Sequence, residues 1–371
     1  MTFSADALTW EERATFTLRS LYAQYGYQPY KMSKFEEYDL YVRNKDFLIS
    51  DSVITFTDTT GRLMALKPDV TLSIIKNTRD GDASVRKLYY NENVYRVSKS
   101  SGSFRELMQV GLECLGTLSA ADVGEVLWLA ACSLCAIHED FVLDVSHLGL
   151  VGAVLDRAPG AAVPALLACV GQKNPHEIAS VAAEYGIDAQ TTDALQMLAT
   201  LAGPPSDVLP KLGRLAEQFG AEDALEELSA VLGVFGGSEL EKGIRVDASV
   251  LDNMKSYNGI VFKGFLRGIP DSVLSGGQYD RLMQRMHRES RAVGFAVYLD
   301  ALERLLEENG DPYAADLLLL HEPDVPPAVV RRTVSALSAE GTSVFAASAD
   351  PGLRIKRTAR LLASGEVIFL V

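Results

Sequence analysis

The sequence predicts an α+β protein: an antiparallel sheet with flanking helices, a helical insertion and a small C-terminal α/β domain. Over 52–116, strand-like segments follow one another with few helices between them, which is typical of antiparallel α+β sheets. Residues 151–243 are rich in Ala, Leu and Glu instead. After Gly310 strands alternate with helices. We therefore expect a core over 1–310, which includes the insertion, and a reduced C-terminal domain over 311–371.

Composition argues against a nucleic-acid-binding, secreted, membrane or disulfide-rich protein. The 371 residues include 35 Lys and Arg against 49 Asp and Glu, a net charge of −14, so nucleic acid is not an expected partner. Residues 1–16 lack the pattern of a signal peptide, and no apolar run approaches the roughly 20 residues of a membrane helix. Four cysteines are too few for a disulfide framework. We expect a soluble, cytoplasmic protein that does not enter a membrane.

The N-terminal elements carry clear local signals. Residues 9–25 are predicted to form a helix, because Thr9 and Glu12 match a capping box and apolar residues follow at helical spacing. Residues 52–67 are predicted to form a hairpin, in which VITFTD and RLMALK flank the turn residues 58–61.

The later elements follow in order. A short helix is expected from Asp69 to Lys76, and then three strands, VRKLYY, NVYRV and RELMQVGLECLG. Strand patterning returns after the insertion at GIRVDASV and YNGIVFKGFL, and SGGQYDRLM and AVGFAVYLDALERLL each look like a strand or turn leading into a helix. The last domain is predicted as strand ADLLLLH, helix PAVVRRTVSALSAEG, strand TSVFAAS, helix LRIKRTARLLAS and strand EVIFLV.

The strand Leu107 to Gly116 is the most informative local pattern. Its even-numbered residues form an apolar face, whereas Gln109, Gly111 and Glu113 form the other face. Glycine weakens a strand unless something approaches the backbone closely. A small polar ligand over Gly111, held by Gln109 and Glu113, explains the pattern; a solvent-exposed sheet face explains it equally well.

Other local patterns are less specific. Asp69 in KPDVT matches a helix cap, and the glycines of SGGQYD match a turn. The sequence has no GxxxxGK[ST], GxGxxG or GxSxG motif. Cys132 and Cys135 form a CxxC in an apolar helical run, where we expect buried structural thiols, and the five histidines are scattered. No catalytic residue, metal site or cofactor is therefore expected.

Several motifs in order carry a family resemblance over about residues 5–310. They are MALKPDVT, the stretch from NVYRV to RELMQVGLECLG, SYNGIVFKGF, VLSGGQYDRLM and AVGFAVYLD. Together they resemble the catalytic domain of class II histidyl-tRNA synthetase. With DVSHLGLVGAVL at 144–155, the chain resembles more closely the non-catalytic relatives of that enzyme, the regulatory subunits of ATP phosphoribosyltransferase. The resemblance implies the antiparallel sheet of class II aminoacyl-tRNA synthetases.

Departures from the synthetase pattern concern ATP and the adenylate. Asp252 and Ala301 align with arginines of the synthetase, and Tyr298 aligns with a glycine. Ser98 aligns with the motif 2 glutamate and Ser103 with an arginine of the following loop. Cationic groups stabilise the charge that develops on a transferring phosphoryl group, so their loss predicts a chain without synthetase activity.

The residues of the amino-acid pocket match the synthetase pattern more closely than those of the ATP site do. By the resemblance, Asp69, Thr71 and Gln109 match positions that hold the α-amino group of histidine. Glu113 and Tyr257 match positions that contact the imidazole, and Arg96 matches an arginine near the carboxylate. These six residues are the predicted histidine site.

The resemblance implies a regulatory function in histidine biosynthesis. The expected partner is a short-form ATP phosphoribosyltransferase catalytic subunit, which this chain activates and through which histidine feedback acts on the first step of the pathway. A dimer within a hetero-oligomer is expected, with histidine as the effector. Two alternatives stay open: an active histidyl-tRNA synthetase, and a free-standing histidine-sensing paralogue of the synthetase.

Overall fold

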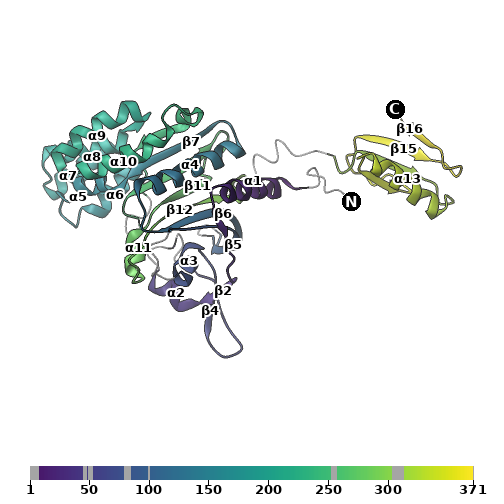
Figure 1. Ribbon diagram of the computed structural model, residues 1–371, viewed down its shortest axis with the longest axis horizontal. Coiled ribbons are helices and arrows are strands. Elements are labelled where there is room, and N and C mark those ends of the chain that lie inside the picture. The colour runs from purple at the N-terminus through teal and green to yellow at the C-terminus, as the bar shows by residue number, and fades with distance from the viewer. Residues whose placement is uncertain are drawn as a thin grey trace. The chain divides into compact units, whose positions relative to one another are not determined.

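The computed structural model describes residues 8–44, 48, 53–78, 85–98, 101–251, 257–302 and 313–370. Its chain separates into two compact units, Met1–Leu305 and Leu306–Val371. The first unit is built on a nine-stranded sheet, and the second contains a four-stranded sheet with one helix (Figure 1).

The nine-stranded sheet runs in the order β1-β5-β6-β12-β11-β10-β7-β9-β8. Its strands are β1 (Gln28–Pro29), β5 (Arg86–Val97), β6 (Phe104–Gly116), β12 (Arg291–Tyr298), β11 (Leu274–Gln278), β10 (Ile260–Leu266), β7 (Phe141–His147), β9 (Ile244–Asp247) and β8 (Ala202–Gly203). All neighbouring pairs are antiparallel except β1 with β5 and β7 with β9. The predicted α+β class, with a mainly antiparallel sheet, is confirmed.

One strand replaces two predicted ones. The segments VRKLYY and NVYRV form the single strand β5, which pairs with β6 without interruption from Arg86 opposite Leu115 to Val97 opposite Phe104. The polar residues in the middle suggested a break. In the folded chain Asn93 instead donates a 2.6 Å hydrogen bond across the ladder to Glu106. Pairing along the whole of β6 therefore outweighs the weak local preference of these residues for a strand.

Two helices cover one face of the sheet. They are α1 (Trp10–Gln24), with the expected capping box between Thr9 and Glu12, and α4 (Ala120–Ile137), with a second box between Ser119 and Asp122. By length and composition α4 is apolar enough to cross a membrane, but half of its residues are buried and it packs on α1, β10 and β12. It is a core helix of this unit.

The C-terminal half of α4 contains Cys132 and Cys135, whose exposure differs from the prediction. Cys135 is exposed and Cys132 is partly exposed, so the expectation that both thiols are buried is wrong for Cys135. The helix is apolar around most of its circumference, so its sequence pattern does not distinguish the buried side from the side that faces the solvent. Packing on the sheet decides this orientation.

The other face of the sheet is covered near β5 and β6 by a smaller layer. A three-stranded sheet of order β2-β4-β3 consists of β2 (Phe35–Glu37), β4 (Leu63–Leu66) and β3 (Thr55–Thr57), so the predicted hairpin is present. The helices α2 (Tyr38–Arg43), α3 (Thr71–Asn77) and α11 (Asp280–Arg285) complete this side. Their apolar residues share one buried cluster with Tyr90, Val94 and Tyr279.

Six helices form most of the segment between β7 and β9 and gather at one end of the sheet (Figure 1). They are α5 (Leu148–Leu155), α6 (Val163–Gly171), α7 (Pro175–Tyr185), α8 (Ala189–Thr200), α9 (Pro205–Phe219) and α10 (Glu222–Leu232), followed by the 3-10 turns Gly233–Phe235 and Glu239–Gly243. Glycines and prolines delimit two of these helices: Gly186 and Gly220 end α7 and α9 with positive φ, and Pro175 and Pro205 begin the same two helices.

The second unit contains β13 (Leu317–His321), α13 (Pro327–Ala339), β14 (Val344–Ala347), β15 (Arg357–Leu361) and β16 (Val367–Leu370), in the sheet order β14-β13-β15-β16. The predicted helix LRIKRTARLLAS, residues 353–364, is wrong, because its middle forms the strand β15. Ala359 and Leu361 are buried at alternate positions, and Gly365 allows a turn into antiparallel pairing with β16. That hairpin makes the sheet mixed, where a parallel one was expected.

Candidate functional site

The polar face of β6 is buried. Gln109 is 3% exposed and Glu113 is 2% exposed, so the alternative of a solvent-exposed sheet face is wrong. Helix α3 and the turn before α11 cover the Glu113 end of this face, through contacts of their side chains with its carboxyl group. A buried polar pair on a sheet face requires hydrogen-bond partners, and the site is defined by where those partners come from.

Glu113 receives two short hydrogen bonds. The hydroxyl of Thr71, at the start of α3, donates to Oε1 at 2.6 Å, and the hydroxyl of Tyr279, just before α11, donates to Oε2 at 2.5 Å. Burial raises the pKa of Glu113 from 4.5 to about 8, although the two donors lower it, and the nearby Asp69 adds to the rise. Burial therefore favours the protonated form of this carboxyl group.

Asp69 lies in the turn between β4 and α3. Its Oδ1 accepts a 3.0 Å hydrogen bond from the backbone N–H of Leu72, which is the contact of a helix cap. Burial raises the pKa of Asp69, whereas Arg96 lowers it. Arg96 donates from Nε to the carbonyl of Pro68 at 3.2 Å, which holds its guanidinium beside this turn. The structure thus brings a raised-pKa carboxyl group and a cation to the same turn.

Gln109 presents an unsatisfied polar group. Its side-chain nitrogen is buried and has no hydrogen-bond partner among the residues that the structure describes. A buried amide donor without a partner is costly, at about 1 to 3 kcal/mol, and is satisfied most simply by a bound polar molecule. The amide also has an oxygen, so Gln109 suits either end of an amino acid.

Gly111 has a different role from the one expected. A Cβ placed there meets the carbonyl oxygen of Phe295 at 2.3 Å and the hydroxyl of Tyr90 at 2.5 Å. Tyr90 lies directly opposite Gly111 on β5. The glycine therefore allows the close approach of the Phe295 carbonyl group and of the Tyr90 phenol. These two groups occupy the space directly over Gly111 where a ligand was predicted.

Tyr257 borders the same site from the segment that precedes β10. Its ring packs edge-on against Tyr279, with 6.5 Å between the ring centroids, and a Cβ at Gly277 would meet it at 2.9 Å. Tyr257 is partly exposed, so its ring stands at the margin of the buried face. The prediction for Asp252 falls outside the described residues.

Three site residues were missed by the sequence analysis. Tyr90 and Tyr279 contribute buried phenols, and Gly294 leaves room for the carboxyl group of Glu113, which lies 1.9 Å from the position of an added Cβ. Gly294 is directly opposite Glu113 on β12, so strand pairing reveals it. The order of the strands was the missing information, because residues 113 and 294 lie far apart in the sequence.

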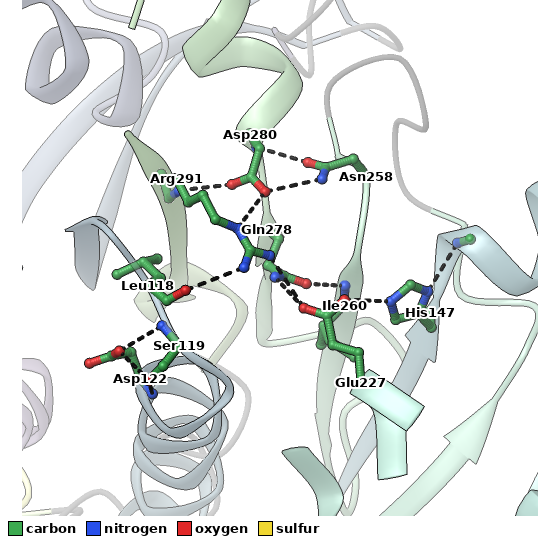
Figure 2. A network of polar contacts seen from close by, with 12 residues as sticks. Leu118, Ser119, Asp122, His147, Glu227, Asn258, Ile260, Gln278, Asp280 and Arg291 are labelled. Carbon is green, nitrogen blue, oxygen red and sulfur yellow. Dashed lines mark hydrogen bonds and ion pairs between the residues drawn. The ribbon is translucent and has the colours of Figure 1, made fainter. Parts of the chain in front are cut away.

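A second polar network joins the sheet to the insertion (Figure 2). The carboxylate of Glu227, on α10, accepts from Gln278 at 3.0 Å, from Arg291 at 3.3 Å and from His147 at 3.2 Å. The ring nitrogen Nδ1 of His147 accepts from the backbone of Gly149 at 3.1 Å, so the proton on Nε2 points to Glu227. These bonds lower the pKa of Glu227 to about 2, with His147 as the largest cause.

The network continues toward the margin of the candidate site. Arg291 donates from Nε to Asp280 at 3.0 Å, and the side chain of Asp280 accepts from Asn258 at 3.2 Å. The side-chain oxygen of Gln278 accepts from the backbone of Ile260 at 2.5 Å. Three of the segments that carry the resemblance supply residues of this network, namely 144–155, 256–265 and 273–283, whereas Glu227 comes from the insertion.

Comparison with known proteins identifies similar chains. A family model described as histidyl-tRNA synthetase matches residues 6–302. The chain is 26% identical over 314 residues to the ATP phosphoribosyltransferase regulatory subunit of Oceanobacillus iheyensis, covering 83% of this chain and 77% of the relative. It is 29% identical over 308 residues to the regulatory subunit of Moorella thermoacetica, covering 81% and 78%.

Solved structures share the fold. A Bacillus halodurans structure described as ATP phosphoribosyltransferase regulatory subunit/histidyl-tRNA synthetase superimposes with a TM-score of 0.73 at 22% identity, covering 92% of this chain and 90% of that one. Histidyl-tRNA synthetase from Nostoc gives 0.73 at 18% identity, covering 100% and 97%. A chain of the ATP phosphoribosyltransferase complex of Thermotoga maritima gives 0.60 at 20% identity, covering 80% and 98%.

Proposed function

Because this chain belongs to the histidyl-tRNA synthetase family, we propose that it is a non-catalytic member that serves as the regulatory subunit of ATP phosphoribosyltransferase. Its partner is a short-form catalytic subunit, which it activates, and it carries histidine feedback to the first step of histidine biosynthesis. Curated relatives that match about four fifths of the chain have this name, which supports the proposal.

The donor and acceptor set on the buried face of β6 supports histidine as the effector. A free amino acid needs an anion for its ammonium, a cation for its carboxylate and, for histidine, polar partners for the ring. Asp69, Arg96 and Glu113 provide these three kinds of group on adjoining elements. The unsatisfied amide nitrogen of Gln109 is the observation that carries the proposal, because a polar ligand on this face would accept a hydrogen bond from it.

Thr71 and Tyr257 complete the proposed site. Thr71 fixes the carboxyl group of Glu113 through its 2.6 Å hydrogen bond, and Tyr257 closes the margin beside Tyr279. An ammonium next to Asp69 favours the ionised form of that carboxylate, which burial otherwise disfavours. Binding of a cationic group therefore relieves an electrostatic cost that the free protein retains.

The catalytic alternative within the family is an active histidyl-tRNA synthetase. Tyr298 argues against it, because its phenol hydrogen-bonds to Ser275 at 2.5 Å on the same sheet face, directly opposite Gln109, at a position where the synthetase pattern has a glycine. Ala301, in the 3-10 turn after β12, has no charge for a phosphoryl group. Activation of the partner must then be allosteric, through tighter binding of one of its conformations.

The proposal includes assembly and location. We expect a dimer of this chain within a hetero-oligomer, and a cytoplasmic location in keeping with four free cysteines. A free-standing histidine sensor would bind histidine without forming this complex.

The test is reconstitution with the short-form catalytic subunit. Phosphoribosyl transfer from phosphoribosyl diphosphate to ATP is measured for the catalytic subunit alone, with this chain, and with this chain plus histidine. We expect activation in the second mixture and inhibition in the third. A catalytic subunit that is fully active alone and unaffected by this chain contradicts the proposal, and histidine-dependent exchange of pyrophosphate into ATP by the chain alone identifies the synthetase instead.

A further inference from the structure

The helical insertion makes a charged contact with the sheet next to the segment that contains Tyr257. Glu227 is the group on the insertion that makes it, and three side chains from β7, β11 and β12 converge on its carboxylate (Figure 2). Its side chain is 29% exposed, whereas Gln278 is 1% exposed and His147 is 5% exposed. Gln278 and His147 are thus held in the core, whereas the side chain of Arg291 is 40% exposed, and Glu227 reaches all three from the insertion.

The contacts of Gln278 lead directly to the segment that follows Tyr257. The side-chain oxygen of Gln278 accepts from the backbone of Ile260 at 2.5 Å, and its backbone oxygen accepts from Asn258 at 3.2 Å. At Gly259 an added Cβ would lie 2.1 Å from that side-chain oxygen, so only glycine fits between them. The orientation of the Gln278 amide therefore fixes residues 258–260.

Glu227 determines that orientation. Because the amide oxygen of Gln278 accepts from Ile260, its nitrogen must find an acceptor on the other side, and Glu227 is that acceptor at 3.0 Å. Arg291 strengthens the arrangement, since it bonds both Glu227 and Asp280, and Asp280 in turn bonds Asn258. Backbone bonds also hold residues 258–260, from Asn258 to Gln278 and from Leu148 to Gly259. Their side-chain contacts with Gln278 and Asp280 are the ones that lead to the carboxylate of Glu227.

We propose that Glu227 is a positioning residue for the histidine site, through which the helical insertion controls the placement of Tyr257. The inference rests on the proposed histidine site. It assigns the insertion a part in regulation: an arrangement of the insertion that withdraws Glu227 releases Gln278, the 258–260 segment and the ring of Tyr257 together. Histidine binds the arrangement in which these residues are fixed, so occupancy of the site and position of the insertion are reciprocally coupled.

Lys173 provides a matched control. It lies between α6 and α7 of the same insertion and makes a 2.5 Å ion pair with Asp247 on β9. The Lys173→Ala variant thus removes a charged contact between insertion and sheet, as Glu227→Ala does, but its partner Asp247 hydrogen-bonds to Ser249 and not to the segment around Tyr257 that the structure describes. Both variants are expected to lower the melting temperature, which isolates the effect on histidine binding from a general loss of stability.

The experiment is calorimetric titration of free histidine into the full-length chain and its variants. Glu227→Ala is expected to weaken histidine binding roughly fivefold or more, because residues that share one hydrogen-bond network are energetically coupled. Lys173→Ala is expected to change histidine affinity less than about twofold, because Lys173 lies outside that network. Tyr257→Phe and the double variant Glu227→Ala with Tyr257→Phe complete a cycle. If Glu227 acts through Tyr257, the double variant is weakened by much less than the product of the two single effects.

Hydrogen exchange supplies a readout that does not depend on the ligand. The backbone amides of Asn258 and Ile260 are expected to exchange faster in Glu227→Ala than in Lys173→Ala. Equal histidine affinities in these two variants, or single effects that multiply fully in the double variant, overturn the inference while the proposed function stands. A wild-type chain that does not bind histidine overturns the proposed histidine site, and the inference with it.

Discussion

The hydroxyl of Tyr279 donates a 2.5 Å hydrogen bond to the carboxyl group of Glu113, a residue 166 positions earlier in the chain. The two side chains meet because only β12 lies between β6, which carries Glu113, and β11, which ends at Gln278 directly before Tyr279. Thr71 bonds the other oxygen of the same carboxyl group. A buried acid with two donors is thereby held in one orientation before any ligand arrives.

Glu113 makes the stability of the protein depend on pH. Its pKa is 4.5 in an unfolded chain and about 8 in the fold, so the folded state binds more protons between these values. Its contribution is fully present below 4.5 and is lost as the pH rises through about 8. We expect the free energy of unfolding, measured by urea titration, to decline across this interval, and Glu113→Gln to flatten the decline.

Glu106→Gln is the control for that measurement. Glu106 lies on the same strand, but hydrogen bonds from Asn93 and Tyr95 lower its pKa, so its contribution is lost only as the pH falls through that lowered value. The decline above pH 4.5 should therefore be the same in Glu106→Gln as in the wild type. An unchanged decline in Glu113→Gln would place the titrating group elsewhere.

Tyr279→Phe removes one donor from Glu113 and leaves the ring in place. Tyr279 is buried, so loss of the bond is expected to cost about 1 to 3 kcal/mol in the free energy of unfolding. Because that donor favours the ionised form of Glu113, its removal raises the pKa of the acid further. Histidine binding, measured by titration calorimetry, should weaken because the carboxyl group loses its fixed orientation; wild-type affinity in this variant would exclude Glu113 from the site.

Asp69→Ala removes both a helix cap and the proposed partner of the histidine ammonium. The lost cap is expected to cost about 1 kcal/mol of stability. Asp188→Ala is the matched variant, because Asp188 caps α8 with a 2.9 Å bond to Thr191. Melting temperatures should fall similarly in both, whereas histidine inhibition of the reconstituted complex should be lost only in Asp69→Ala. Full inhibition in Asp69→Ala would contradict the assigned role.

The chain alone is expected to form no histidyl adenylate and to charge no tRNA. Asp252→Arg with Ala301→Arg should not restore either activity, because Ser98, Ser103 and Tyr298 also differ from the synthetase pattern and cooperating residues are not additive. Pyrophosphate exchange with and without histidine is the measurement. Exchange above background in the wild type would overturn the regulatory assignment.

Local signals in the sequence predicted elements with strong caps and turns. The capping box of α1, the hairpin at 58–61 and the glycine ends of α7 and α9 depend on contacts within a few residues, so short segments contain the needed information. Prediction failed at β15, where LRIKRTARLLAS has helical spacing. There the hairpin with β16 and the pairing with β13 outweigh local propensity.

By itself the sequence determined the α+β class, the family resemblance and the alternation on β6 that sets Gln109 and Glu113 on one face, because strand period and motif order are properties of the chain. Only the tertiary structure decided what covers that face. Tyr90 fills the space over Gly111, Gly294 admits the carboxyl group of Glu113, and Glu227 reaches the sheet from the insertion. Each depends on which strands are neighbours, and strand order arises from packing between residues far apart in the sequence.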